Sequence, residues 1–354
     1  MRAMTASSAT KAQHGTVLVT GGSGFIAGHC ILRLAAAGYR VRTTVRSLAR
    51  EEAMRDLLGE AGLTDQGAFE VVAADLLSDA GWPEAMEGVD GVLHVASPVA
   101  PGHVEDEDAV IRPAREGALR VLRAAHDAGV RRVVLTSAFY AVAWGHPHDE
   151  HVFTEEDWTV LDGPGTDAYG RSKTLAEQAA WDFVRGEGAG LELTTMLPTA
   201  VMGSVMGPSV TGSNGVVRML LTGKVPATPD IRMPIVDVRD VAEAHVLALE
   251  SLQAAGERFL LSDGPALSMA EIARLLRVTL GPAARKVPRR SMPGWVMRAA
   301  GLESTEMRAN AADLGYERRA SHEKATRVLG WEQRPGREAV IAAGRTMVEA
   351  GLLD

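Results

Sequence analysis

The stretch TVLVTGGSGFIA, residues 16–27, decides the fold. Its first five residues are apolar or β-branched and are followed by glycine, which is typical of a short strand buried on both faces. Gly21 permits a sharp turn, Gly24 allows an anion to approach the backbone, and Ala27 is small enough for a helix to pack on the strand. The spacing of the following apolar residues predicts a helix that ends near Gly38.

Strand-like and helical segments alternate through the first 260 residues. Strands are expected at 16–20, 39–45, 69–73, 91–96, 132–136, 193–197 and 258–261. A further strand and helix pair over 235–251 is expected to return to the sheet. Strands and helices that alternate at this pitch form right-handed βαβ units, so the predicted fold class is α/β, a doubly wound parallel sheet of the Rossmann type.

The character of the chain changes after Pro198. Residues 202–215 are rich in glycine and proline, and the chain beyond residue 268 is mostly helical with proline breaks. We therefore expect a disordered tail at 1–14 and a dinucleotide-binding Rossmann domain built from 15–200 plus 234–262. Residues 201–233 plus 263–354 are expected to form a smaller, mostly helical substrate-binding lobe.

Composition narrows the class of protein. The chain has 354 residues, 46% of them hydrophobic and 23% charged, which excludes a mainly disordered protein. Its net charge of −8 argues against nucleic acid as a partner, and no apolar run approaches the roughly 20 residues of a membrane helix. Cys30 is the single cysteine, so no intramolecular disulfide can form. These features favour a cytoplasmic protein without a membrane partner.

The glycine turn lies between a strand and a helix, the setting in which a helix N-terminus binds the pyrophosphate of a dinucleotide. The second strand ends TVRS, residues 44–47, and no acidic residue follows until Glu51. An acid there would bind the ribose of NAD, whereas an arginine accommodates the 2′-phosphate of NADP. Arg46 therefore predicts NADP. Asp75, at the end of the third strand, either accepts from the adenine amino group or caps the next helix.

Tyr169 and Lys173 are four residues apart in a helical stretch and therefore share one face. A phenol with a pKa near 10 is a usable acid at neutral pH. The lysine ammonium and an oxidised nicotinamide are expected to lower the pKa of the phenol. The pair suits proton delivery to a carbonyl oxygen while hydride arrives from a nicotinamide cofactor.

These motifs together resemble the extended short-chain dehydrogenase/reductases, in the branch of dihydroflavonol reductase-like and cinnamoyl-CoA reductase-like carbonyl reductases. The matching stretches are 20–26, 42–46, 94–98, 133–137, 169–177, 198–203 and 236–242. The resemblance implies NADPH as cofactor and a catalytic serine–tyrosine–lysine set. It implies that Tyr169 is the proton donor and that Lys173 binds the ribose hydroxyls. The complete predicted cofactor site is Thr20, Gly21, Gly24, Phe25, Ile26, Arg46, Asp75, Leu76, Val95, Ala96, Ser97, Tyr169, Lys173 and Pro198.

One position departs from the pattern of this family. The family has Thr-Ser-Ser after the fifth strand, and the catalytic hydroxyl comes from the second serine, where this chain has Ala138. Either Ser137 takes the role, or a water or a substrate group replaces the missing hydroxyl. Because an oxyanion donor contributes about 2.7–4 kcal/mol, we expect slow turnover that Ala138→Ser would change.

The substrate is expected to lie between an aromatic segment and the loop that follows Pro198. The predicted substrate residues are Phe139, Tyr140, Trp144, Met202 and Met206. This lining carries almost no charge and favours an apolar or aromatic aldehyde or ketone. We expect an NADPH-dependent carbonyl reductase that works as a monomer or weak homodimer. The alternatives are a nucleotide-sugar epimerase or dehydratase on the same fold, and a non-catalytic NADP sensor.

The histidine-rich run 146–151 suggests a metal site at first sight. It lies in a proline-containing stretch without a fixed face, and no cysteine accompanies it. We expect a solvated loop at the rim of the site and predict no metal.

Overall fold

The computed structural model describes residues 14–98, 106–300, 311 and 313–353. The predicted tail lies, apart from His14, outside the described residues. Seven parallel strands form the main sheet, in the order β11-β7-β5-β4-β1-β2-β3. They are β1 (His14–Val19), β2 (Tyr39–Val45), β3 (Phe69–Ala73), β4 (Gly91–His94), β5 (Arg132–Thr136), β7 (Glu192–Pro198) and β11 (Arg258–Leu261). The predicted doubly wound parallel sheet is confirmed.

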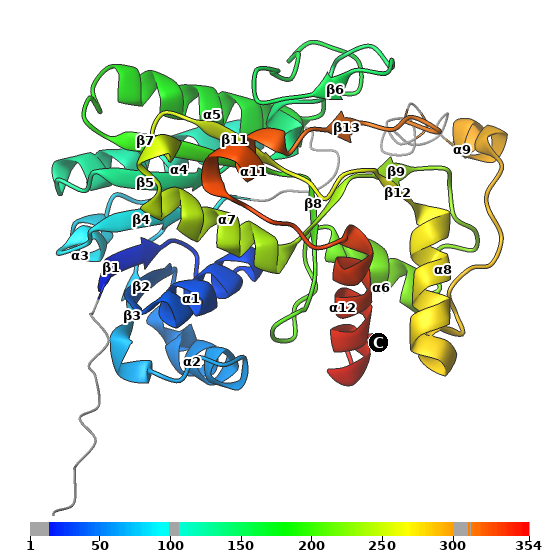
Figure 1. Cartoon of the computed structure of the whole chain (residues 1–354), viewed down its shortest axis with the longest axis horizontal. Coiled ribbons are helices and arrows are strands. Elements are labelled where there is room, and N and C mark those ends of the chain that lie inside the picture. Colours follow the sequence, from blue (N-terminus) through cyan, green and yellow to red (C-terminus); the bar gives the residue numbers. More distant parts are fainter. Residues whose placement is uncertain (1–13, 99–105, 301–310, 312, 354) are drawn as a thin grey trace, which may run out of the picture.

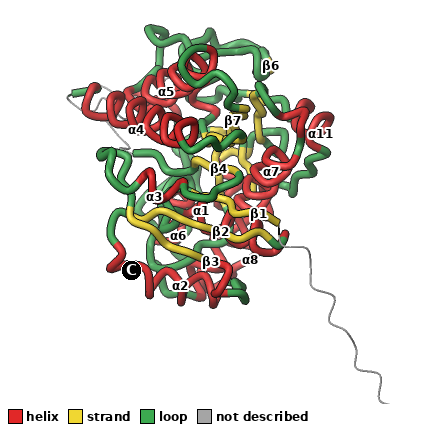
Figure 2. Tube along the Cα trace, turned by 90° about the vertical axis from the view of Figure 1, so that its left-hand side faces the viewer, coloured by secondary structure: helices red, strands yellow, loops and turns green. Residues whose placement is uncertain are grey.

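Helices cover both faces of this sheet, and Figure 2 shows the strands with α4 and α5 on one side and α7 on the other. One face carries α1 (Phe25–Ala37), α2 (Glu51–Glu60), α7 (Val238–Glu250) and α11 (Glu323–Leu329). The other face carries α3 (Trp82–Met86), α4 (Asp108–Asp127) and α5 (Ala168–Arg185). Alternate strand residues face the two layers, so Val17 and Val19 pack with α1 while Leu18 packs with α4.

The strand order reverses between β1 and β4, the topological switch point of the sheet. In open α/β sheets a ligand binds beyond the carboxyl ends of the strands at such a point. The glycine turn follows β1, and residues 95–97 follow β4. The fold therefore brings together two segments of the predicted cofactor site that are about 75 positions apart in the chain.

A second, smaller body lies beside the carboxyl edge of the sheet (Figure 1). It contains α6 (Asn214–Thr222), α8 (Met269–Leu280), α9 (Gly294–Ala300) and α12 (Gly336–Glu349). α6, α8 and α12 share an apolar core with Met202 and Ile235. Two short ladders connect this region to the rest: β8 (Ala200–Met202) with β10 (Ile235–Asp237), and β9 (Arg232–Met233) with β12 (Leu267–Ser268).

Two details differ from the expected division of the chain. The segment at 235–237 does not rejoin the main sheet, because it pairs with β8, which continues the chain beyond the end of β7. Ala325, Leu329 and Trp331 lie in the core beneath the sheet, although they belong to the stretch expected in the lobe. Among the described residues, no helix is long and apolar enough to cross a membrane.

Candidate active site

The glycine turn adopts the conformation that an anion site requires. Gly21 has a φ of +73°, and a Cβ there would lie 2.9 Å from the Cβ of Ala96. Its N–H donates to Oγ1 of Thr44 (3.0 Å), which fixes the turn to β2. α1 begins at Phe25, and within the described chain no side chain caps it and no acid lies in its first turn. The N–H groups and the positive end of the helix dipole are therefore available to an anion.

Thr20 holds the turn against the end of β4. Its Oγ1 accepts hydrogen bonds from the N–H groups of Val95 (3.0 Å) and Ala96 (2.9 Å). It therefore donates its own proton to Nδ1 of His94, 2.9 Å away. Burial, together with the charge of Lys173, lowers the pKa of His94 to about 3, so the ring is neutral. Thr20 is fully buried, and its side chain shapes the cofactor site without facing it.

Arg46 and Asp75 follow the carboxyl ends of β2 and β3. Arg46 is exposed and makes no hydrogen bond or ion pair with any residue that the structure describes. Asp75 is half-buried and accepts from the N–H of Leu77 (3.0 Å) in a turn. It caps no helix in the described chain, because α3 begins only at Trp82. Leu76, also half-buried, packs against Gly117 of α4.

These residues fit a dinucleotide that carries a 2′-phosphate. The uncapped start of α1 suits a pyrophosphate, and the unpaired guanidinium of Arg46 suits a further phosphate. Phe25 and Ile26 form the first turn of α1, and residues 95–97 are half-buried beside it.

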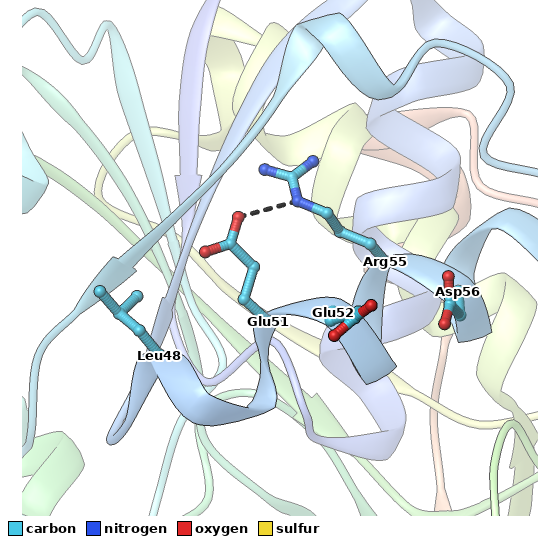
Figure 3. A pocket seen from close by; sticks show the side chains of 5 residues that line it. All are labelled: Leu48, Glu51, Glu52, Arg55 and Asp56. Atoms are coloured by element: carbon cyan, nitrogen blue, oxygen red, sulfur yellow. Dashed lines mark hydrogen bonds and ion pairs between the residues drawn. The ribbon is translucent and has the colours of Figure 1, made fainter.

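A surface hollow of about 390 Å³ lies nearby, over a 3-10 turn (Leu48–Arg50) and α2 (Figure 3). Glu51, Glu52 and Asp56 line it together with Leu48 and Arg55. The guanidinium of Arg55 is paired with Glu51 at 2.8 Å. Three carboxylates and one neutralised arginine repel phosphate, so the hollow is not a phosphate site.

Tyr169 and Lys173 lie on one face of the first turns of α5. Asp167 caps this helix by accepting from the N–H of Gly170 at 2.7 Å. Burial, with a smaller contribution from Asp167, raises the pKa of Tyr169 to about 12. The sequence predicted the opposite direction. Burial dominates in the protein alone because Nζ of Lys173 lies 5.9 Å from the ring centre and is itself desolvated.

Lys173 borders a small polar cavity beneath the end of the sheet. Burial lowers its pKa to about 8, against the opposing effect of Glu177. The cavity measures about 20 Å³ and is also lined by His94 and Ser137. This space is large enough for one water molecule, and the polar side chains of the lining would hydrogen-bond to it.

Glu177, one turn after Lys173, is the centre of a buried polar cluster. Its carboxylate accepts from Ser137 Oγ (2.6 Å), Thr195 Oγ1 (2.8 Å) and Arg258 Nε (2.8 Å). The prediction that Ser137 provides the catalytic hydroxyl is therefore not supported, because that proton is already donated to Glu177. Sequence reasoning missed this cluster. A glutamate at i+4 from Lys173 and an arginine inside a buried strand were the available signals.

The aromatic segment 139–144 is divided between the core and the site. Tyr140 and Trp144 are half-buried and stacked, with ring centres 3.7 Å apart. Tyr140 also meets Tyr169 edge to face at 5.0 Å. Phe139 is only 2% exposed and packs against Phe153, so it supports the aromatic wall from the core and does not line the site as predicted.

A residue from the distant C-terminal part completes this wall. The guanidinium of Arg318 lies 4.5 Å from the ring centre of Trp144 and 5.2 Å from the ring centre of Tyr316. Arg318 also pairs with Asp313 at 2.8 Å. Nothing in the sequence indicated this contact, because about 175 positions separate the partners.

The loop after Pro198 is less exposed to the site than predicted. Pro198 ends β7 and is buried, and Met202 is fully buried in the core of the smaller body. Met206 packs over Gly28 of α1, where an added Cβ would lie 2.6 Å from its methyl group. Met202 therefore lies in the core of the smaller body, whereas Met206 contacts the first turn of α1.

The histidines of the loop at 146–151 have separate partners. His146 contacts the carbonyl groups of Val142 and Trp158, His148 stacks on Tyr316, and His151 pairs with Asp157. In the described ranges no group of three or more metal-ligating side chains is present.

Comparison with known proteins identifies the family. Residues 17–261 match the NAD dependent epimerase/dehydratase family. The chain belongs to this family. Dihydroflavonol 4-reductase of Zea mays is 34% identical over 251 residues, 69% of each chain. Cinnamoyl-CoA reductase 1 of Arabidopsis thaliana is 36% identical over 253 residues, 70% of each chain. The predicted membership of the extended short-chain dehydrogenase/reductases is confirmed, and the chain is an oxidoreductase of that group.

Solved structures agree with this fold. Gre2 of Candida albicans in complex with NADPH superposes with a TM-score of 0.77 at 25% identity, covering 95% of this chain and 99% of that one. The UDP-glucose-4-epimerase of Stenotrophomonas maltophila with bound NAD gives 0.75 at 23% identity, covering 96% and 99%. The second likeness concerns the fold alone.

Proposed function

We propose that this protein reduces a small apolar or aromatic aldehyde or ketone with NADPH, and that Tyr169 donates the proton. The observation that carries the proposal is the meeting of Tyr169 and Lys173 on α5 with the stacked pair Tyr140 and Trp144. One face of α5 supplies the acid and the cation, and the aromatic wall bounds the space in front of them.

The cofactor is NADPH, as predicted, and its nicotinamide supplies the hydride when bound. The reductase relatives and the NADPH complex of Gre2 support this, together with Arg46 at the end of β2. The start of α1 binds the pyrophosphate and Arg46 binds the 2′-phosphate. Asp75 accepts from the adenine amino group, and residues 95–97 line the cofactor site beside the glycine turn.

Tyr169 holds the proton that the product alcohol receives. Burial raises its pKa to about 12, so the phenol is fully protonated before the reaction. As the carbonyl oxygen gains negative charge it becomes more basic than the phenol, and the proton moves to it. Lys173, with a pKa of about 8, is mostly charged at neutral pH and stabilises the phenolate that remains.

The substrate class follows from the wall around Tyr169. Tyr140 and Trp144 present aromatic surface, and the cation of Arg318 is covered by Trp144 and paired with Asp313. Such a wall binds apolar or aromatic groups and offers little to a substrate with several charges.

Epimerases and dehydratases belong to the same family, which keeps that activity as the second candidate. The epimerase neighbour binds NAD, whereas β2 of this chain ends with Arg46 and no acid before Glu51. Retained NAD in the purified protein, with no NADPH oxidation by any carbonyl, would favour this candidate.

The test is a screen of NADPH oxidation with aldehydes, ketones and acyl thioesters, with NADH in parallel. Tyr169→Phe is the decisive variant, since it keeps the ring and removes the acid. We expect turnover to fall roughly 10²- to 10⁴-fold while the affinity for NADPH is unchanged. Tyr39→Phe, on the far end of β2, is the matched control and should keep full activity. Wild-type turnover by Tyr169→Phe would contradict the proposal.

A further inference from the structure

The inference concerns the hydroxyl group that Ala138 cannot provide, and it rests on the proposed function. A carbonyl oxygen has two lone pairs and becomes an alkoxide as hydride arrives, so a second hydrogen-bond donor beside Tyr169 lowers the barrier. Ala138 has only a methyl group, and the proton of Ser137 is donated to Glu177 at 2.6 Å. Neither residue at the expected position can supply the second hydrogen bond.

Tyr140 is a free donor in the right neighbourhood. It lies in the 3-10 turn Phe139–Ala141, directly after the end of β5, and meets Tyr169 edge to face with ring centres 5.0 Å apart. A Cβ added at Gly170, in the turn of α5 that carries the acid, would lie 3.6 Å from its ring. In the part of the chain that the structure describes, no group hydrogen-bonds to its hydroxyl.

The position of Tyr140 is fixed by a hydrogen bond to its backbone and by stacking of its ring. Its carbonyl group accepts from Thr159 Oγ1 at 2.7 Å, and the same Oγ1 accepts from the N–H of Trp144 at 3.0 Å. Trp144 stacks on the ring with an interplanar angle of 11° and is itself covered by Arg318. A donor fixed in this way needs no reorganisation during the reaction.

We propose that the hydroxyl of Tyr140 donates the second hydrogen bond to the substrate carbonyl oxygen and replaces the serine that the family pattern would place at Ala138. Tyr169 transfers its proton to that oxygen, and Tyr140 keeps its own proton throughout. Burial raises the pKa of Tyr140 well above its ordinary value, and ionisation of Tyr169 raises it further. The two phenols therefore differ in role: one is the acid and the other is a permanent donor.

The test is Tyr140→Phe, which preserves the stacking on Trp144 and removes only the hydroxyl. We expect kcat to fall roughly 10²- to 10³-fold, with the KM for NADPH unchanged, since the hydrogen bond strengthens in the transition state. Tyr39→Phe removes a hydroxyl in the same way at the start of β2, away from the site, and its activity should be that of the wild type. Thermal unfolding of each variant establishes that the fold is intact.

Ala138→Ser distinguishes a hydrogen-bond-donor role of Tyr140 from a purely structural role of Tyr140. In the Tyr140→Phe background the new serine should restore at least a tenth of the lost turnover, whereas a structural defect would not respond. In the wild type the same change should leave kcat within a few-fold, because two donors are already present. This replaces the expectation from the sequence, which had not identified Tyr140 as a second donor. Wild-type kcat in Tyr140→Phe, or no rescue by serine, would overturn the inference. If Tyr169→Phe is inactive and Tyr140→Phe is fully active, the proposed function stands and the inference about Tyr140 is wrong. If Tyr169→Phe is active, the proposed function and the inference are both wrong.

Discussion

Two sets of polar side chains lie one helical turn apart on α5, and they differ in whether their polar groups have hydrogen-bond partners. Around Glu177, the hydroxyls of Ser137 and Thr195 and the guanidinium of Arg258 satisfy the carboxylate completely. Around Tyr169, neither the phenol nor the ammonium of Lys173 has a hydrogen-bond partner within the described ranges. We call the first set, Glu177 with its partners, the closed set, and the second, Tyr169 with Lys173, the open set.

The difference separates structure from function. A buried polar group without a partner costs about 1–3 kcal/mol, so the set around Tyr169 is a candidate for binding a ligand. Arg46 and Arg258 show the same contrast between two arginines. Arg258 lies 3.6 Å from the ring centre of Trp158 and is paired with Glu177, whereas Arg46 is exposed and unpaired in the described structure.

Glu177→Gln should break the closed set and have the largest effect on stability. The variant leaves the buried guanidinium of Arg258 without its counter-charge, which costs roughly 3–5 kcal/mol. We expect the free energy of unfolding, measured by urea denaturation, to fall by that amount. Glu187→Gln, the same change at an exposed position just after this helix, is the control and should be neutral. Equal stability of Glu177→Gln and wild type would show that the cluster contributes nothing.

Lys173→Met should raise the free energy of unfolding, because it removes a buried ammonium group that has no hydrogen-bond partner in the described residues. The folded pKa of about 8 lies below the ordinary 10.5, so burial of the charged lysine opposes folding below pH 8. The shift corresponds to about 3 kcal/mol, and the variant should be more stable than the wild type by about that amount at pH 7. Its reductase activity should be lost, since Lys173 no longer supports the phenolate.

The pH dependence provides an independent measurement. Between pH 8 and 10 the unfolded chain binds more protons at Lys173 than the folded chain, so the wild-type free energy of unfolding rises with pH over this interval. Lys173→Met lacks the group and should not show this rise. A parallel rise in both proteins would mean that another group is responsible.

The sequence predicted those features of the fold and of the site that depend on neighbouring residues. Strands 39–45, 69–73, 132–136 and 258–261 were placed exactly, because short β-branched runs between turn residues are local signals. The face shared by Tyr169 and Lys173 follows from helical spacing. Both features need only residues that are close in the chain.

Contacts between distant segments could not be predicted in this way. Glu177 and Arg258 are 81 positions apart, and Arg318 reaches Trp144 from the C-terminal part of the chain. Periodicity also cannot tell which of two neighbouring aromatic residues faces the core, so Phe139 and Tyr140 were assigned to the same lining. The turn at 139–141 separates them, since it directs consecutive side chains differently.

Arg46→Ala removes the exposed arginine after β2, which is unpaired among the described residues. Its effect should be smaller than those of Glu177→Gln and Lys173→Met and should be limited to the binding of NADPH. A charged hydrogen bond to phosphate contributes about 1.5–3 kcal/mol, so the KM for NADPH should rise roughly 10- to 100-fold while that for NADH changes little. Arg40→Ala, an exposed arginine near the opposite end of β2, is the matched control. The unfolding free energy of both variants should equal that of the wild type. If Arg46→Ala instead destabilises the fold and leaves the preference for NADPH intact, then the unpaired guanidinium has a structural role, and the absence of a partner does not mark a binding residue in this protein.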